Sequence, residues 1–70
     1  MNILGELNLF LDRADKVKGD DERLKALLAD LKNKYEIPDS VAELEKWEEN
    51  TPEADRILRT YRFILSLRSV

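Results

Sequence analysis

The apolar residues of this chain recur every three or four positions, which is the spacing of one face of an α-helix. Four such stretches, separated by short polar breaks, predict helices over about residues 2–17, 21–35, 41–49 and 52–68. Short connections between helices make neighbouring helices antiparallel. The predicted fold class is therefore all-α, a small antiparallel bundle of four short helices in a single domain spanning residues 1–70.

The breaks contain residues that begin and end helices. Side chains able to cap a helix stand at the start of the four stretches: Asn2, either Asp20 or Asp21, Ser40, and Thr51. Ser40 with Glu43 matches a capping box, and Pro52 suits the first turn of a helix. Gly19 fits a left-handed helix end, and Pro38 disfavours helical angles in the residue before it. These residues predict the same boundaries as the apolar pattern.

The last helix is apolar on two sides. One broad stripe, at about 100° per residue, consists of Ala54, Ile57, Leu58, Tyr61, Ile64 and Leu65. Phe63, Leu67 and Val70, spaced i, i+4, i+7, lie almost opposite that stripe. Two interpretations follow: the second stripe is an exposed binding strip, or the C-terminal helix is central and is covered on both sides.

Arginines border the second stripe, with Arg56 on the same face and Arg59 and Arg62 along its flank. Aromatic residues and arginine are enriched at the centres of protein interfaces. We therefore expect a partner-binding site on the last helix that accepts either another protein or a second copy of the chain. Its predicted residues are Phe63, Leu67, Val70, Arg56, Arg59 and Arg62, and Leu9, off the main stripe of the first helix, could extend it.

The third helix is short and acidic, and its apolar residues are Val41, Leu44 and Trp47. We expect Trp47 to be a core anchor that closes the bundle. Residues 36–55 contain eight acids and one base, whereas residues 56–70 contain four arginines and no acid. These two segments either neutralise each other across an antiparallel contact, or one of them attracts a charged partner.

Composition narrows the function classes. The 70 residues include no cysteine and no histidine, which removes thiolate metal sites and the commonest general base. A glycine-rich phosphate loop is also absent from the sequence, and a chain this short leaves little volume for a ligand pocket. We therefore predict no catalytic, cofactor-binding or metal-binding residues, no small-molecule substrate and a non-catalytic role as a regulator, inhibitor or assembly factor.

Size and hydropathy indicate the setting. Apolar burial and chain entropy nearly balance at this length, so a second chain is a common remedy and a homodimer is one expectation. No apolar run approaches the roughly 20 residues that span a bilayer, so no membrane contact is expected. The N-terminal residues lack the pattern of a signal peptide, and a cytoplasmic location is expected.

Nucleic-acid binding is the alternative function. A resemblance to the helix-turn-helix segment of phage-repressor-like proteins involves the predicted second helix, the turn at 36–40 and the predicted third helix. The segment Trp47-Glu48-Glu49-Asn50-Thr51-Pro52 is similar to the one that follows the reading helix in some of those proteins. This resemblance implies a DNA-binding regulator, but the glutamates of the would-be reading helix would repel phosphates. Contact with nucleic acid would therefore depend on the arginines of the last helix.

A second resemblance is to small bacterial nucleoid modulators. Asn33-Lys34-Tyr35-Glu36 with Asp39, and Ala54-Asp55 with Leu58, are similar to fragments of that group. Because those proteins dock on a partner protein, this resemblance implies an interaction role.

Overall fold

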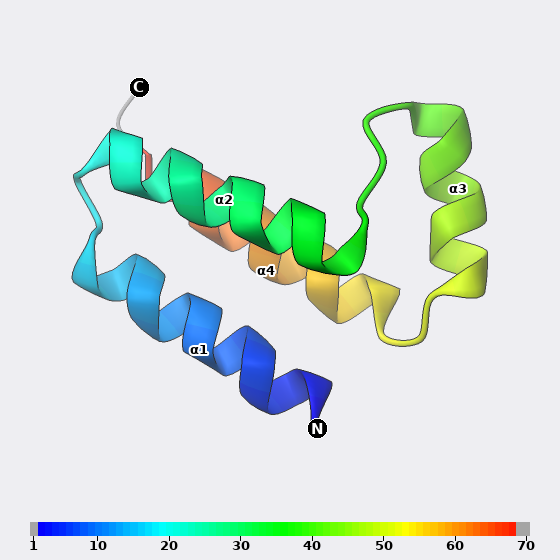
Figure 1. Cartoon of the computed structure of the whole chain (residues 1–70), viewed down its shortest axis with the longest axis horizontal. Coiled ribbons are helices and arrows are strands. Elements are labelled where there is room, and N and C mark those ends of the chain that lie inside the picture. Colours follow the sequence, from blue (N-terminus) through cyan, green and yellow to red (C-terminus); the bar gives the residue numbers. More distant parts are fainter. Residues whose placement is uncertain (1, 69–70) are drawn as a thin grey trace.

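The computed structural model describes residues 2–68 and shows four helices in this part of the chain. The helices are α1 (Ile3–Lys16), α2 (Asp21–Tyr35), α3 (Val41–Asn50) and α4 (Ala54–Ser66), and no strand occurs among the described residues (Figure 1). The predicted all-α class with four helices is confirmed, with helix ends that lie at most two residues from the expected ones.

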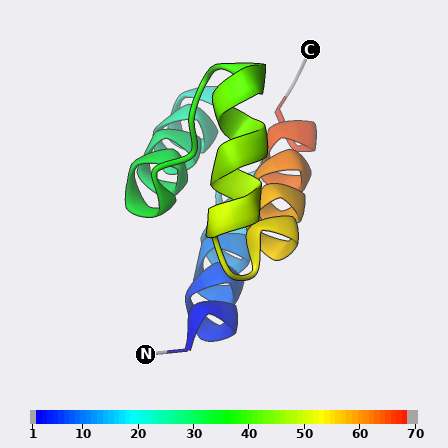
Figure 2. The same ribbon diagram turned by 90° about the vertical axis from the view of Figure 1, so that its right-hand side faces the viewer.

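The C-terminal helix is central, as predicted. Helix α4 packs against each of the other three helices, whereas the backbone of α3 closely approaches no described helix except α4. Helix α2 runs opposite to α1, and α4 lies alongside them in the same direction as α1 (Figure 1). Helix α3 crosses one end of this group of three, with α4 beside it (Figure 2).

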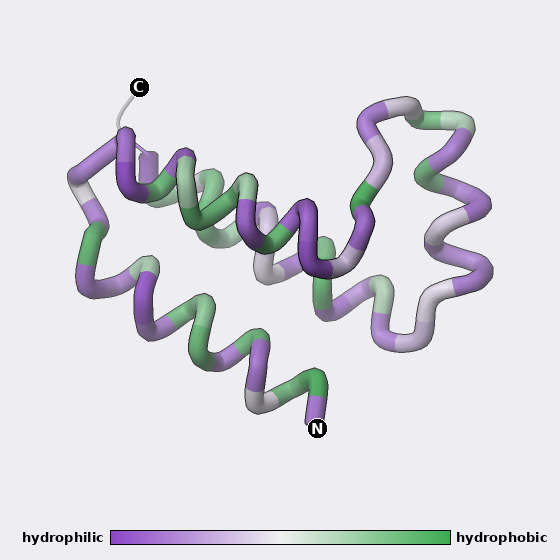
Figure 3. Tube along the Cα trace, in the orientation of Figure 1, coloured by the Kyte–Doolittle hydropathy of each residue, from purple (hydrophilic) through white to green (hydrophobic). Residues whose placement is uncertain are grey.

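The core forms where α1, α2 and α4 meet. Hydrophobic and hydrophilic residues alternate along these helices at helical spacing, so each helix has an apolar side (Figure 3). The most deeply buried large side chains are Leu24, Leu31, Ile57 and Ile64. Helix α3 has no buried residue and adds only partly buried side chains to this core.

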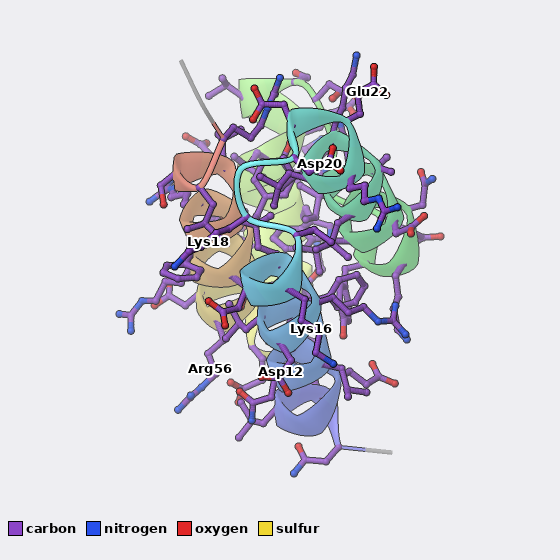
Figure 4. The ribbon with its side chains drawn as sticks, turned by 90° about the vertical axis from the view of Figure 1, so that its left-hand side faces the viewer. Asp12, Lys16, Lys18, Asp20, Glu22 and Arg56 are labelled. Carbon is purple, nitrogen blue, oxygen red and sulfur yellow. The ribbon has the colours of Figure 1, made fainter. Side chains whose placement is uncertain are left out.

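The first two helices begin at the predicted caps. The Asn2 Oδ1 accepts a hydrogen bond from the backbone N–H of Leu4 at 3.0 Å, and the Asp20 Oδ1 accepts one from that of Arg23 at 3.3 Å. Gly19, between α1 and α2, has φ of 93°, the left-handed geometry expected of a glycine in this position. Figure 4 shows this connection, which carries Lys18 and Asp20.

The predicted start of α4 is wrong. The sequence predicts that Thr51 caps a helix beginning at residue 52, but the helix begins at Ala54. The backbone N–H of Ala54 donates to the Thr51 carbonyl at 3.3 Å. Glu53 has φ of 62°, so its left-handed backbone separates the turn at Thr51 and Pro52 from the helix.

The expected capping box before α3 is also wrong, although α3 does begin after Ser40. The Ser40 side chain makes no cap hydrogen bond, so the first turn of α3 is not closed by it. Sequence inspection also gave no sign that Glu36, at φ of 55°, would end α2 in a left-handed conformation usually taken by glycine or asparagine.

Two hydrogen bonds tie the last turn of α2 to its neighbours. The Trp47 Nε1–H donates to the Tyr35 carbonyl at 2.9 Å and holds α3 against the end of α2. The Tyr35 hydroxyl donates to the Glu6 carboxylate at 2.9 Å, and the Lys34 ammonium lies 3.5 Å from the other oxygen of that carboxylate. Trp47 is thus the anchor of α3 that we predicted, but its ring is half-buried rather than enclosed.

Between residues 2 and 68, no helix has both the length and the apolar character that crossing a membrane requires.

Candidate protein-binding groove between α1 and α4

The structure divides the second apolar stripe of α4. The Phe63 side chain is 51% exposed, whereas Leu67 is partly buried and packs against the core. Val70, the third residue of the predicted strip, lies outside the described residues. The stripe is therefore neither a continuous exposed surface nor fully covered, and Phe63 is its exposed part.

Phe63 stands at the edge of an open groove, here called the α1–α4 groove. Its wider part has a volume of about 470 Å³ and continues into a smaller hollow toward the start of both helices. From α1 the groove is bordered by Leu4, Leu7, Asn8, Leu11, Asp12 and Asp15. From α4 it is bordered by Arg56, Arg59, Thr60 and Phe63.

The two buried residues that line the α1–α4 groove, Leu7 and Thr60, form its floor, and among these described residues no polar side-chain group is left without a hydrogen bond. Thr60 is buried, and its hydroxyl donates to the Arg56 carbonyl at 2.9 Å, one turn back along the same helix. Leu7, also on the floor, is 3% exposed. Because the floor is apolar and its hydroxyl is already bonded, the groove suits an apolar side chain from outside.

The two walls of the groove have opposite charges. Asp12 and Asp15 lie on the α1 wall, and Arg56 and Arg59 lie on the α4 wall. Figure 4 shows Asp12 and Arg56 on their respective helices at this side of the molecule. The walls do not neutralise each other, because no ion pair within 4 Å joins them in the described part of the chain.

The arginines differ in their partners. The Arg56 Nε lies 2.9 Å from a carboxylate oxygen of Glu53, so the first arginine is engaged locally. Arg59 forms no ion pair within 4 Å with any side chain of residues 2–68, and it borders both parts of the groove. Its guanidinium is thus free to meet a carboxylate brought by another molecule.

Arg62 belongs to a different surface. It borders a second groove of about 330 Å³ on the other side of α4. That groove also contains Leu65, which is 45% exposed, and the ion pair between Lys32 and Asp39. Of the six residues predicted to bind a partner, the structure brings Phe63, Arg56 and Arg59 together at one groove.

The expected neutralisation between the acidic segment (residues 36–55) and the basic segment (residues 56–70) takes the form of one ion pair among the described residues, from Arg56 to Glu53, three positions earlier in the chain. Among the described residues, none of the contacts within 4 Å joins a glutamate of α3 to an arginine of α4. The glutamates of α3, and Arg59 and Arg62 of α4, therefore keep their charge for solvent or for a partner.

Sequence reasoning missed the part of the groove that α1 provides. Leu4 is 38% exposed and Leu11 half-buried, and both stand at the edge of the apolar stripe of α1. Their place at the edge of that apolar stripe was the available signal. Leu9, suggested as an extension of the site, is 57% exposed but does not border the groove.

Comparisons of the chain with protein-family models, with curated proteins and with solved structures found no match.

Proposed function

We propose that this protein is a small non-catalytic interaction module that binds another protein chain through the α1–α4 groove. In this role it would act as a regulator, an inhibitor or an assembly factor, and its proposed setting is the cytoplasm.

The observation that carries the proposal is the exposure of Phe63 beside an apolar floor. An aromatic side chain that is 51% exposed at the edge of a groove leaves a large apolar area in water. Covering such a side chain completely is worth about 1.5–3 kcal/mol, so roughly half of that remains to be gained from a partner. Interface centres are typically built from aromatic residues and arginine, and Arg59 lies beside Phe63 in the same groove.

The shape of the groove indicates the kind of contact. It runs between two helices that lie side by side, and its floor is apolar while its walls are charged. A helix with apolar residues along one side and charged residues at the margins fits such a surface, which is a common mode of recognition between helical proteins.

Site-specific photo-cross-linking tests this function. We would replace Phe63 with p-benzoylphenylalanine in cells that produce the protein natively, and replace Val41 in the same way as a matched control. Val41 is 77% exposed and lies on α3, outside the groove. Irradiation is expected to give a covalent adduct with a protein chain from position 63 and none from position 41. Equal adducts from both positions, or no protein adduct from position 63, would overturn the proposal.

Nucleic-acid binding is supported by one observation. Arg59 and Arg62 are exposed and form no ion pair with other described residues, so both can meet phosphates. They border grooves on different sides of α4, however, and this arrangement separates the positive charges.

A mobility assay with DNA and RNA at low salt tests this alternative. Retardation that disappears with added salt, and with Arg59→Glu and Arg62→Glu together, would support it. Unchanged migration at low salt would exclude it.

A further inference from the structure

We infer that the partner which fits the α1–α4 groove is a second copy of this chain, bound in a twofold dimer that places α1 of each copy over α4 of the other. This inference rests on the proposed function, because it names the occupant of the same groove.

Charge is the first argument. One wall of the groove is acidic, with Asp12 and Asp15, and the other is basic, with Arg56 and Arg59. A twofold axis parallel to the two helices turns a second copy so that its acidic wall faces the basic wall of the first. Each copy then offers the carboxylates of Asp12 and Asp15 to Arg59 of the other, twice per dimer.

The level of the charges along the helices is the second argument. Helices α1 and α4 run in the same direction (Figure 1). Asp12 and Asp15 border the wider part of the groove together with Arg59 and Phe63, so these residues stand at the same level along the helices. Rotation about an axis parallel to the helices keeps that level. The facing charges therefore meet in register.

The competing twofold arrangement is disfavoured by the same charges. An axis that crosses the two helices would lay α1 on α1 and α4 on α4. Asp12 and Asp15 would then approach their own copies, and so would Arg59. Like charges facing each other oppose association, so the groove selects the first arrangement.

Apolar contacts match the selected arrangement. Phe63 is 51% exposed and Leu4 is 38% exposed, one on each wall, with the half-buried Leu11 between them. When α1 of one copy covers α4 of the other at the same level, Phe63 of each copy meets Leu11 of its partner, and Leu4 extends the apolar surface toward the start of the helices. The aromatic side chain then occupies the centre of the interface, with the charged pairs around it.

The size of the surface limits the affinity. A standard interface buries about 800 Å² per partner, which is about 15% of the 5244 Å² that the described chain exposes. Helices α1 and α4 are each about 20 Å long and about 10 Å wide, so side by side they present an outline of only about 400 Å². We therefore expect a weak dimer, with a dissociation constant in the micromolar range.

Charge reversal combined with sedimentation equilibrium tests the inference. The wild-type mass is expected to rise from the 8.2 kDa of one chain toward twice that value as concentration increases through the micromolar range. Arg59→Asp, and separately the pair Asp12→Arg and Asp15→Arg, place like charges across the interface and should each keep the chain monomeric. Mixing the two variants should restore the doubled mass, because opposite charges again face each other in both halves of the dimer.

The control is Lys25→Asp, which makes the same change in net charge as Arg59→Asp but lies exposed on α2, outside both grooves. This variant should dimerise like the wild type. Circular dichroism confirms that each variant is helical. If a charge-reversed variant does not fold, Arg59→Gln takes its place, and it should weaken the dimer at low salt more than at high salt.

The outcomes separate this inference from the proposed function. A wild-type mass that stays at one chain up to about 0.5 mM, far above the expected micromolar constant, would overturn the second copy as partner. Cross-linking of position 63 to a different protein would then still support the function. A dimer that persists in both charge-reversed variants, or monomeric variants that do not combine when mixed, would overturn the pairing of α1 with α4.

Discussion

Neighbouring residues on α4 provide the most informative stability test, because Ile64 is 0% exposed and Phe63 is 51% exposed. The perturbation is Phe63→Ala in one variant and Ile64→Ala in the other. Both changes occur in the same turn of the same helix, so the comparison holds the helix fixed and varies burial. It decides between the two original interpretations of the second apolar stripe.

The structure gives the expected magnitudes. Truncating a fully buried isoleucine to alanine costs about 2–5 kcal/mol, from lost burial and from the cavity left behind. Burial of about half of the Phe63 side chain contributes about 1 kcal/mol to the free energy of unfolding. Alanine at this position offsets up to about 0.5 kcal/mol of that loss, because its helix propensity is higher. Phe63→Ala should therefore cost less than about 1 kcal/mol. The total free energy of unfolding of a 70-residue domain is roughly 4–10 kcal/mol, so Ile64→Ala removes a large share of it.

Urea unfolding followed by circular dichroism measures both costs. With a slope near 1 kcal/mol per molar urea, the midpoint should fall by about 2 M or more for Ile64→Ala and by less than about 1 M for Phe63→Ala. The protein is kept dilute, so that any dimer has dissociated. If Ile64→Ala is unfolded without urea, Ile64→Val replaces it, with an expected cost of about 0.5–1.5 kcal/mol. A Phe63→Ala variant as unstable as the Ile64 variant would refute the assignment of Phe63 to the surface.

Three further predictions concern single contacts. Asp20→Ala should lower the free energy of unfolding by about 1 kcal/mol, because it removes the side chain that caps α2. Ser40→Ala should change the free energy of unfolding little, because the Ser40 side chain makes no cap hydrogen bond, and the urea midpoints of the two variants check both expectations. Gly5→Ala should raise the melting temperature, since nothing lies within 4 Å of an added Cβ and alanine favours a helix by up to about 1 kcal/mol; a lower melting temperature would show that the space is filled. Burial, and then the hydrogen bond to Glu6, raise the pKa of Tyr35 to about 12, above the usual 10, so the stability contributed by its neutral hydroxyl is present below pH 10 and is lost as the pH rises toward 12. The unfolding midpoint of Tyr35→Phe should therefore fall less than that of the wild type between pH 9 and 12, and parallel curves would contradict this.

The apolar repeat was sufficient to predict the class of fold and the position of each helix. Periodic burial determines both properties, and a central C-terminal helix followed from its two apolar sides. Helix ends were predictable where a side chain caps the backbone directly, as at Asn2 and Asp20. They were not predictable at Glu36 and Glu53, because glutamate gives no sequence signal for a left-handed backbone.

The candidate site was only partly predictable. Helical spacing placed Phe63 and Leu67 on one stripe, but the way that α4 packs leaves Phe63 half in water and Leu67 against the core. Which side chains of α1 would complete the groove depended on the rotation of α1 against α4. That rotation is set by tertiary packing, so the sequence pattern of either helix alone does not contain it.

The most direct test of the α1–α4 groove as a binding surface is a map of amide chemical shifts. The isotope-labelled chain is titrated with the unlabelled chain, and in a parallel experiment with any protein captured from position 63. The account predicts that the shifting amides belong to the sides of α1 and α4 that border the groove, including Leu11 and Phe63. Shifts confined to α3 or to the groove around Leu65 would contradict it.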